Sequence, residues 1–456
     1  MIKTVTQTLS GWGGMPKQEC HLFRPEKSHV LEQLITSGDE STFLARGLGR
    51  AYGDAALNEN GGVILNERLN RFISFDEKSG LLECEGGVSL AEIIETFLPH
   101  GWFLPVSPGT KFVTIGGAVA CDIHGKNHHR DGSFSAFVDQ FHLLTANGKT
   151  LICSRQQNKN AFWATVGGMG LTGIVTRVKL RLRKVSTSSL VVNYQQLPNL
   201  DAVLEQLLED EKHTYSVAWI DCLASGDALG RGVLMRGEHA ELDDIKVLSP
   251  RQMENPLQLA SSTALTVPID MPEFLLNPTT VGAFNSLYYA THKTKRVLVD
   301  YEKYFYPLDS ISHWNRLYGK AGFIQYQVAL PAEQSAAGLK ALLEAVSASK
   351  RASFLAVLKT FGAANEAPLS FPFKGHTLTF DIPFRDDLPE FVRQLDEITL
   401  QFGGRIYLAK DALLSAENFR VMYPRWKEWL EIKRELDPQN RFSSSLARRL
   451  QMELYN

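Results

Sequence analysis

Apolar and polar positions change their spacing along the chain, and the change divides it into three stretches. Up to about residue 186, short apolar runs predict strands at 43–45, 63–65, 81–85 and 174–182. A helical pattern follows Ser89, with Glu92 in capping-box position. Two further runs, 141–145 and 150–153, flank Asn147-Gly148 and predict a hairpin with a type I′ turn. This first stretch therefore mixes helices and strands.

Longer helical patterns separate the strands beyond residue 187. Helices are predicted at 200–211 and 336–348, and strands at 323–330 and 377–382. After residue 404, a short strand at 405–408 precedes helices at 416–423 and 426–436, and Asp437-Pro438 ends the last helix. We therefore predict an α+β protein with two domains, divided into residues 1–186, 187–404 and 405–456.

Length, charge and cysteine usage narrow the class of protein. A chain of 456 residues is longer than single hydrophobic cores usually grow, which supports two domains. The formal net charge of −2 provides no basic field, so we expect no nucleic-acid partner. The five cysteines are widely spaced and form no CxxC pair, which argues against a disulfide framework or a zinc site.

Membrane signals are weak. Residues 1–14 lack the apolar core of a secretory signal, and no apolar run is long enough to span a bilayer, so we expect a cytoplasmic protein without a transmembrane segment. Residues 257–289 are apolar but interrupted by prolines. They fit either a loop with a core helix or a flap that meets lipid, which leaves peripheral contact with the inner membrane open.

Three glycine-rich clusters in the first stretch carry the candidate chemistry. The first contains Gly47, Gly49 and Gly53, where backbone amides can approach a phosphate closely. Its spacing does not match a dinucleotide fingerprint, and no crossover helix follows, so a Rossmann NAD site is disfavoured. A plain glycine turn between strands is the alternative for this loop alone.

The second cluster extends from residue 107 to residue 127. Pro108-Gly109 predicts a tight turn, Thr114 can cap a helix, and small residues from Gly116 onward leave room for a flat ring system. The third cluster, at 166–174, leads into a strand. Three such clusters within one domain length exceed what turns alone require.

These clusters resemble the FAD-binding loops of the vanillyl-alcohol-oxidase type of flavoprotein. The matching segments are Arg-Gly-Leu-Gly-Arg, Pro-Gly-Thr with Gly-Gly-Ala and His-Gly, and Gly-Gly-Met-Gly-Leu-Thr-Gly. The resemblance implies a PCMH-type FAD-binding domain, a separate substrate domain of sheet and helices, and a C-terminal segment that returns to the FAD domain. Many members attach FAD through a histidine of the first loop; Arg50 stands there, which implies non-covalent FAD.

A closer resemblance extends over nearly the whole chain. Segments 45–54, 120–129, 162–168, 367–372 and 409–411 resemble the family of decaprenylphosphoryl-β-D-ribose 2′-oxidases, the flavin subunits of ribose-to-arabinose epimerases of envelope polysaccharide synthesis. The resemblance implies oxidation of the 2′-hydroxyl of a polyprenylphosphoryl-β-D-ribose to the 2′-keto sugar. It also implies an NADH-dependent reductase partner that completes the epimerisation.

The same resemblance assigns site residues. It implies flavin contacts from Ala45, Arg46, Gly47, Leu48, Gly49, Arg50, Ala51, Tyr52, Gly53, Asp54, Ala55, Gly109, Thr114, Ile115, Gly116, Gly117, Cys121, Asp122, Ile123, His124, Ile174 and Tyr407. It places Lys126, Trp219, Gln325, Gln327, Lys359, Thr379 and Lys410 in the substrate pocket. Some family members carry cysteine where this chain has Thr379.

Lys410, His124 and Tyr52 are the candidate catalytic residues, and the sequence leaves open which one takes the hydroxyl proton. Each has an ordinary alternative role: Lys410 as a solvated lysine, His124 as a structural histidine and Tyr52 as a packed aromatic ring. Gln325 and Gln327 point to one face of a strand, and that face could be a solvent-exposed face of the sheet instead of part of the substrate pocket. His124, His128 and His129 do not predict a metal site, because Gly125 and Asn127 interrupt any helix.

Two other functions share parts of this pattern. An FAD-dependent aldose, alditol or sugar-lactone oxidase would use the same loops for a free soluble sugar. A non-catalytic flavin- or nucleotide-binding protein would need neither Lys410 nor the paired glutamines. The oxidant of the reduced flavin, oxygen or a quinone-like acceptor, is left open.

Overall fold

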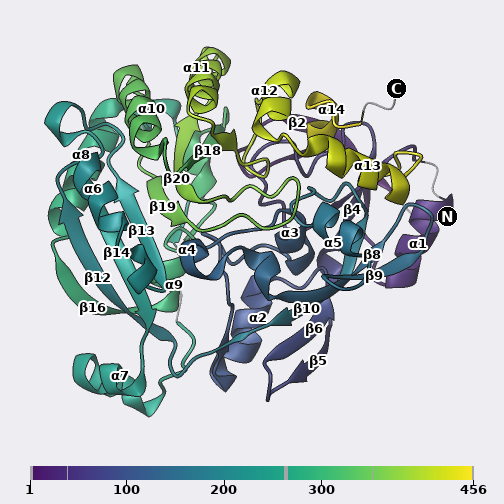
Figure 1. The fold of residues 1–456 in the computed structure, drawn as a ribbon, viewed down its shortest axis with the longest axis horizontal. Helices are drawn as coiled ribbons and strands as arrows, with labels where there is room; N and C mark the ends of the chain where they lie inside the picture. Colours follow the sequence, from purple (N-terminus) through teal and green to yellow (C-terminus); the bar gives the residue numbers. More distant parts are fainter. Residues whose placement is uncertain (1–3, 38–39, 261–264, 352, 454–456) are drawn as a thin grey trace.

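The computed structural model describes residues 4–37, 40–260, 265–351 and 353–453 (Figure 1). Residues 1–3 of the N-terminal segment and residues 261–264 of the apolar stretch 257–289 lie outside the described residues. Sheets and helices built from the first stretch occupy one half of the molecule, and a large sheet from the second stretch occupies the other.

Two sheets form the half built from the first stretch. A four-stranded sheet has the order β1 (Val5–Ser10), β2 (Lys17–Phe23), β4 (Gly62–Leu65) and β3 (Phe43–Arg46), with α1 (Ser28–Ser37) between β2 and β3 in the chain. A five-stranded antiparallel sheet has the order β5 (Phe72–Asp76), β6 (Leu81–Glu85), β10 (Ile174–Arg181), β8 (Val138–Leu144) and β9 (Thr150–Ser154). The predicted strands are therefore confirmed.

Short helices connect these strands: α2 (Leu90–Phe97), α3 (Ile115–Ala120), α4 (His128–Asp131) and α5 (Lys159–Thr165). The predicted capping box is confirmed, because Glu92 N donates to Ser89 Oγ and the Glu92 carboxylate accepts from Ser89 N. Thr114 caps α3 by accepting from Gly117 N at 3.3 Å. These caps satisfy backbone donors that helix starts leave unpaired.

An eight-stranded sheet dominates the other half. Its order is β16 (Lys295–Asp300), β12 (Ser189–Leu197), β14 (Gly232–His239), β13 (Tyr215–Ile220), β19 (Ala356–Phe361), β20 (Gly375–Pro383), β18 (Phe323–Pro331) and β21 (Arg405–Ile406). Three helices, α6 (Leu200–Leu207), α10 (Ser335–Ser349) and α11 (Leu388–Gln401), cover one face (Figure 1). Alternate strand residues such as Val328, Leu358 and Leu378 are buried against these helices, so their neighbours point to the opposite face.

The C-terminal stretch joins both halves. It begins at β21, which pairs with β18, and continues through α12 (Ala416–Met422), α13 (Trp426–Leu436) and α14 (Ser445–Arg449). Trp429 Nε1 donates to the Ala164 carbonyl at 3.0 Å, and Phe43 N donates to the Arg441 carbonyl at 2.6 Å. The stretch thus ends against the first half. The exact domain boundaries stay a prediction.

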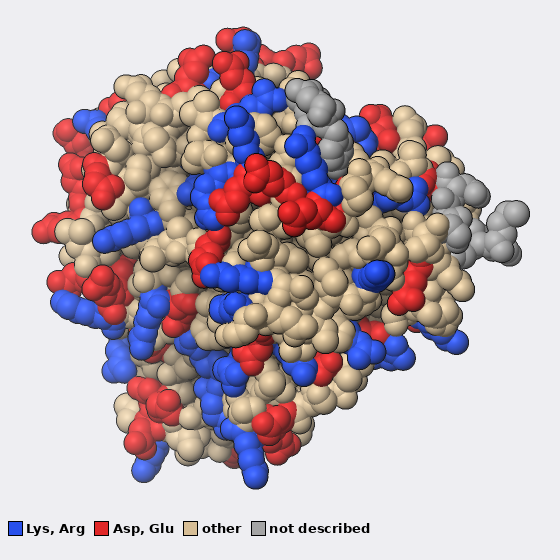
Figure 2. All heavy atoms as spheres, turned by 45° about the vertical axis from the view of Figure 1, so that its right-hand side comes forward, with Lys and Arg blue, Asp and Glu red and all other residues tan. Residues whose placement is uncertain are grey.

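The remaining elements are shorter or peripheral: β7 (Trp102–Phe103), β11 (Arg183–Lys184), β15 (Leu265–Thr266), β17 (Ile311–Ser312), α7 (Leu242–Leu248), α8 (Pro278–Thr291) and α9 (Tyr301–Phe305). In the described part of the chain, no helix is long and apolar enough to cross a membrane. On the surface shown in Figure 2, Lys and Arg side chains are interspersed with Asp and Glu.

Three local predictions are wrong. The β8–β9 hairpin exists, but only Gly148 of the Asn147-Gly148 pair has a positive φ, so the turn is not type I′. Gly148 N donates to the Thr145 carbonyl, and the longer loop needs only one left-handed residue. Pro108-Gly109 forms a bend in which Gly109 has no positive φ, and the helix predicted at 200–211 ends at Leu207.

Candidate active site

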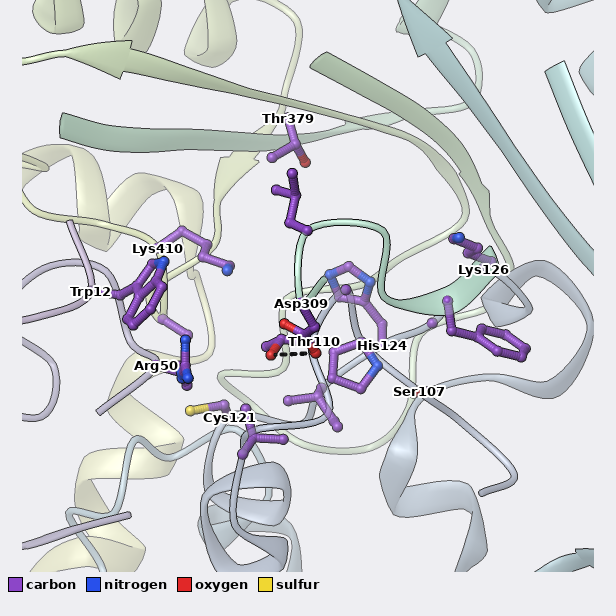
Figure 3. Close-up of a pocket in the computed structure, with 18 of the residues that line it drawn as sticks. Trp12, Arg50, Ser107, Thr110, Cys121, His124, Lys126, Asp309, Thr379 and Lys410 are labelled. Atoms are coloured by element: carbon purple, nitrogen blue, oxygen red, sulfur yellow. Dashed lines mark hydrogen bonds between the residues drawn. The ribbon is translucent and has the colours of Figure 1, made fainter. Parts of the chain in front are cut away.

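A cavity of about 870 Å³ lies between the glycine-rich loops and the open face of the eight-stranded sheet. Side chains from both halves point into it: His124 and Cys121 rise from the loop side, whereas Thr379 and Lys410 approach from the sheet and the C-terminal stretch (Figure 3). Its size falls within the usual range of cofactor and substrate pockets. The site therefore needs both halves of the fold.

Glycines allow the loops on one side to pack backbone against backbone. A Cβ on Gly47 would lie 2.2 Å from Thr114 Oγ1, so the first loop rests on the cap of α3. A Cβ on Gly53 would lie 2.1 Å from the Asp411 carbonyl oxygen, where the C-terminal stretch crosses. A Cβ on Gly116 would meet the Gly86 carbonyl at 2.9 Å. The protein's own atoms, namely backbone at Gly53 and Gly116 and the Thr114 side chain at Gly47, therefore exclude side chains there.

Arg50 gives this loop a cationic side chain. Its guanidinium carbon lies 3.8 Å from the centroid of a Trp12 ring, and its Nε is buried without a hydrogen-bond partner among the described residues. Asp309 closes the same region by accepting from Thr110 Oγ1 at 3.1 Å (Figure 3). A buried donor without a partner needs an acceptor, which a cofactor in the cavity would supply. The loops and this donor fit a phosphate-bearing cofactor.

Lys410 is the central cation on the opposite side. Its Nζ lies 3.8 Å from the centroid of the Tyr52 ring. Burial, opposed by the charge of Asp381 and assisted by that of Lys359, lowers the pKa of Lys410 to about 7. Lys410 is therefore divided between its neutral and charged forms near pH 7.

A hydrogen-bonded relay holds Tyr52 next to Lys410. Gln325 Nε2 donates to the Tyr52 hydroxyl oxygen at 3.2 Å and to Asp381 Oδ1 at 2.6 Å, and Tyr318 donates to the same carboxylate at 3.3 Å. Burial, followed by the Asp381 charge, raises the pKa of Tyr52 well above its usual value. Tyr52 therefore stays protonated and can donate its proton in a hydrogen bond.

His124 lies on the loop side of the cavity. Gln327 Nε2 donates to His124 Nε2 at 3.0 Å, which assigns the ring proton to Nδ1. That Nδ1 is buried and has no partner in the described part of the protein. Burial, then the charge of Lys359, lowers the pKa of His124 well below its usual value. His124 is therefore a neutral donor that faces the cavity.

Two further lysines add positive charge nearby. Lys126 Nζ donates to the Tyr304 carbonyl, and burial with the charge of Lys359 lowers its pKa to about 7. Burial alone lowers the pKa of Lys359 to about 8. Both lysines line the cavity, so an anion there would meet two amines whose charged forms it would stabilise.

Most of the predicted site residues line this one cavity. The predicted residues along its wall are Ala45, Gly47, Leu48, Gly49, Arg50, Ala51, Tyr52, Ala55, Gly109, Thr114, Gly116, Gly117, Cys121, Ile123, His124, Lys126, Trp219, Gln325, Gln327, Lys359, Thr379, Tyr407 and Lys410. The predicted residues that are not on the wall are Arg46, Gly53, Asp54, Ile115, Asp122 and Ile174.

Those off the wall have structural partners. Arg46 donates to the Ser10 and Ala56 carbonyls, and Asp54 pairs with Arg449 at 2.7 Å. The Asp122 carboxylate accepts from Ser133, Asn365 and Ser370, and Ile115 and Ile174 are fully buried in cores. These residues support the cavity from behind. The contacts of every site residue with a bound ligand stay a prediction.

Asp381, Trp12 and Asp309 were missed as site residues. Asp381 lies two residues after Thr379 on an alternating strand, so both side chains point to the same face. An acidic residue on the face that carries Thr379 is the pattern from which Asp381 could have been predicted. Nothing in the local pattern near residue 309 predicts its approach to Thr110, because only the tertiary fold brings them together. Among described residues, no group of three or more His, Cys, Asp and Glu side chains could hold a metal.

Comparisons with known proteins agree with this geometry. Residues 25–154 match the family model of an FAD binding domain, and residues 317–450 match that of D-arabinono-1,4-lactone oxidase. Decaprenylphosphoryl-beta-D-ribose oxidase of Mycolicibacterium smegmatis is 40% identical over 98% of both chains. This chain belongs to the decaprenylphosphoryl-β-D-ribose oxidase family.

More distant relatives share its length. L-Gulonolactone oxidase of Scyliorhinus torazame is 24% identical over 92% of both chains, and that of Mus musculus is 24% identical over 88% of this chain and 87% of the relative. Membership of the decaprenylphosphoryl-β-D-ribose oxidase family confirms the predicted α+β fold, the oxidoreductase activity and FAD as cofactor.

Proposed function

We propose that this chain oxidises the 2′-hydroxyl of a polyprenylphosphoryl-β-D-ribose to a 2′-keto sugar, with non-covalent FAD as the hydride acceptor. One observation carries the proposal: Lys410, Lys359, Lys126 and His124 converge on one cavity beside the glycine loops. The 40% identity to a decaprenylphosphoryl-beta-D-ribose oxidase supports the choice of substrate. Domain boundaries at 186 and 404 follow as part of the same proposal.

The residues around the cavity can hold the sugar and its phosphate. Lys126 and Lys359 would pair with the phosphate, because their lowered pKa values rise again beside an anion. His124 Nδ1 would donate to a sugar hydroxyl, and the amide oxygens of Gln325 and Gln327 would accept from others, since both amide nitrogens already have protein partners. All three side chains are at most 6% exposed, so water screens these electrostatic contacts little.

Lys410 is the residue suited to take the 2′-hydroxyl proton. Its pKa of about 7 leaves a neutral fraction that can accept a proton at neutral pH. Tyr52 is held protonated and His124 is a weak base, so both fit a hydrogen-bonding role better. After proton transfer, the charged Lys410 stays in the cavity, where Asp381 favours the cation.

Arg50 and Cys121 bear on the attachment of the flavin. Arg50 stands at the loop position where many flavoproteins of the vanillyl-alcohol-oxidase type carry a histidine bonded to FAD, and an arginine cannot form that bond. Burial raises the pKa of the Cys121 thiol to about 12, so it carries almost no reactive thiolate at neutral pH. Flavin released by acid denaturation and filtration would support non-covalent binding, whereas flavin retained on the protein would refute it.

The decisive experiment is anaerobic mixing of the flavin-loaded protein with polyprenylphosphoryl ribose. Reduction should bleach the flavin absorbance near its visible maximum, and the product should carry a 2′-ketone by mass spectrometry. Bleaching by free sugar lactones or alditols alone would favour the second candidate, a soluble-sugar oxidase. That candidate has support from the match of residues 317–450 to a lactone oxidase model.

The proposal includes a partner and a place in the cell. A 2′-keto sugar must be reduced from the other face to complete an epimerisation, so we propose an NADH-dependent reductase as the second enzyme. We further propose a cytoplasmic enzyme that works at the inner membrane, because its substrate carries a prenyl chain. Co-sedimentation of the protein with vesicles of bacterial lipids would test the membrane contact, and complete recovery in the supernatant would contradict it.

A further inference from the structure

The cavity extends far beyond Lys410, across the open face of the eight-stranded sheet. Its floor consists of side chains that lie next to each other on paired strands. Gln327 on β18 pairs with Thr379 on β20, which pairs with Val357 on β19, which pairs with Trp219 on β13. All four line the cavity. The floor is therefore continuous from the catalytic end to the middle of the sheet.

The floor continues to the edge of the sheet from the next residue on the same face of β13. Val217, two residues before Trp219 on β13, pairs with Met235 on β14, which pairs with Tyr194 on β12, which pairs with Lys295 on β16. All of these side chains line the cavity. With about 4.8 Å between strands, the path from β18 to edge strand β16 is roughly 29 Å long. A ribose phosphate alone fills only a fraction of that length.

The floor changes in character along this path. At the catalytic end it presents Gln325, Gln327, Thr379 and Lys359, all polar. Beyond β19 the middle of the floor is apolar or aromatic, with Val217, Trp219, Met235, Tyr194, Val297 and Val299, whereas Lys295 and Asp300 on β16 line the cavity at the edge of the sheet. A floor that is polar at the catalytic end and apolar through its middle matches a ligand with a polar head and a hydrocarbon chain.

Helix α8 covers the apolar part. The ring of Tyr288 lies 4.6 Å from the ring of Trp219, and His292 stacks on Tyr288 at 3.9 Å. The centroid of the His292 ring also lies 5.6 Å from that of Tyr194, so α8 contacts the floor at β13 and again at β12. Asn285 holds the helix in place by donating to Asp221 Oδ1 at 2.8 Å. The apolar path is thus a covered channel.

We propose that this channel, defined by Val217, Trp219, Met235, Tyr194 and Val297, binds the first part of the prenyl chain of the substrate and leads it out at β16. The inference rests on the proposed function. The glycine loops at the other side already account for the cofactor, so the channel is available to the substrate. Lys295 lies exposed at the outer end, where the chain leaves the protein.

The test compares a decaprenyl substrate with a monoprenyl substrate of the same phosphoryl ribose. The wild-type protein should reduce its flavin with a higher kcat/KM for the decaprenyl form, because only that chain fills the channel. Met235→Glu should lower the ratio of the two kcat/KM values by at least about tenfold, since a carboxylate would lie against hydrocarbon. Bound-flavin absorbance verifies that the variant is folded.

Asn193→Glu is the matched control. Asn193 precedes Tyr194 on β12 but is exposed and points away from the channel, so the added carboxylate should leave the ratio unchanged. Val297→Trp provides an uncharged second variant that narrows the outer channel, and it should lower the ratio as well.

The outcomes separate the two proposals. Flavin reduction with the same kcat/KM for both chain lengths, or an unchanged ratio in Met235→Glu and Val297→Trp, would overturn the channel and leave the proposed oxidation intact. Flavin that neither substrate reduces would overturn the proposed function itself. A lowered ratio in both channel variants but not in Asn193→Glu supports the channel.

Discussion

The two walls of the cavity are built by different means. The loop wall depends on close approach of the backbone at glycines: a Cβ on Gly53 would lie 2.1 Å from the Asp411 carbonyl oxygen, and a Cβ on Gly47 would lie 2.2 Å from Thr114 Oγ1. The sheet wall depends on side chains, among them Lys359, Gln325 and Gln327, that project from regular strands. A backbone wall suits a cofactor shared by many relatives. A side-chain wall can be changed one residue at a time.

This difference predicts how each wall responds to substitution. Changes to the sheet wall should alter rate and specificity in a protein that still binds flavin. Changes behind the loop wall should alter stability and flavin content first. The substitutions that follow test that separation.

Lys410→Ala should have the largest effect, because it removes the proposed base from the sheet side. Loss of a positioned acid–base group costs about 10²- to 10⁴-fold in rate. Anaerobic stopped-flow absorbance measures the rate of flavin reduction, and flavin content should stay near that of the wild type. Lys340→Ala, an exposed lysine on α10, is the control and should keep the wild-type rate. Near-normal reduction in Lys410→Ala would remove Lys410 from the chemistry.

Arg449→Met should have the largest effect on the loop wall. Arg449 donates to Asp54 Oδ1 at 2.7 Å and to Asp411 Oδ2 at 2.8 Å, and so ties the first loop to the C-terminal stretch. Both carboxylates are almost fully buried, so the loss should reduce the free energy of unfolding by about 3–5 kcal/mol. Urea unfolding followed by tryptophan fluorescence measures it.

The control for Arg449→Met is Arg393→Met. Arg393 forms an ion pair with Glu390 on the surface of α11. Exposed pairs add little to stability, so its unfolding curve should overlay that of the wild type. If Arg449→Met unfolds at the wild-type urea concentration, the C-terminal stretch does not brace the loop.

Gly53→Ala should act on the same wall with a smaller effect. The new Cβ would lie 2.1 Å from the Asp411 carbonyl oxygen, so one of the two backbones must move. We expect a loss of about 1–3 kcal/mol in the free energy of unfolding and weaker flavin binding, measured by flavin fluorescence on dilution. Gly282→Ala on α8, whose added Cβ meets nothing within 4 Å, should retain both properties. Equal behaviour of the two variants would contradict the close-packed loop.

The same contrast explains what the sequence could predict. Glycine clusters, the Ser89 cap and alternating strands leave local patterns, so the family, the FAD loops and the inward faces of β18 and β20 were accessible. Asp309 and Trp12 reach the cavity from segments whose local sequence has no special pattern. The prediction of a type I′ turn at Asn147-Gly148 is wrong because the loop length decides the turn type, and that length depends on the register of β8 and β9.

The smallest expected effect is a shift in the pH dependence of flavin reduction. Neutral Lys410 is the active form, so the rate should rise as the pH passes through its pKa of about 7. Asp381 raises that pKa in its charged form, but burial raises the pKa of Asp381 itself to about 7, so Asp381→Asn should move the midpoint to lower pH by less than about one unit. Asp396→Asn is a matched control, since Asp396 is equally buried but bonds Tyr326 at 3.0 Å on the helix-covered face of the sheet. Single-turnover rates between about pH 5 and pH 9, roughly two units on either side of that midpoint, would show the shift. A midpoint that stays in place or rises in Asp381→Asn would mean that the acid does not act on Lys410, and that burial and the charge of Lys359 set the pKa of the base without it.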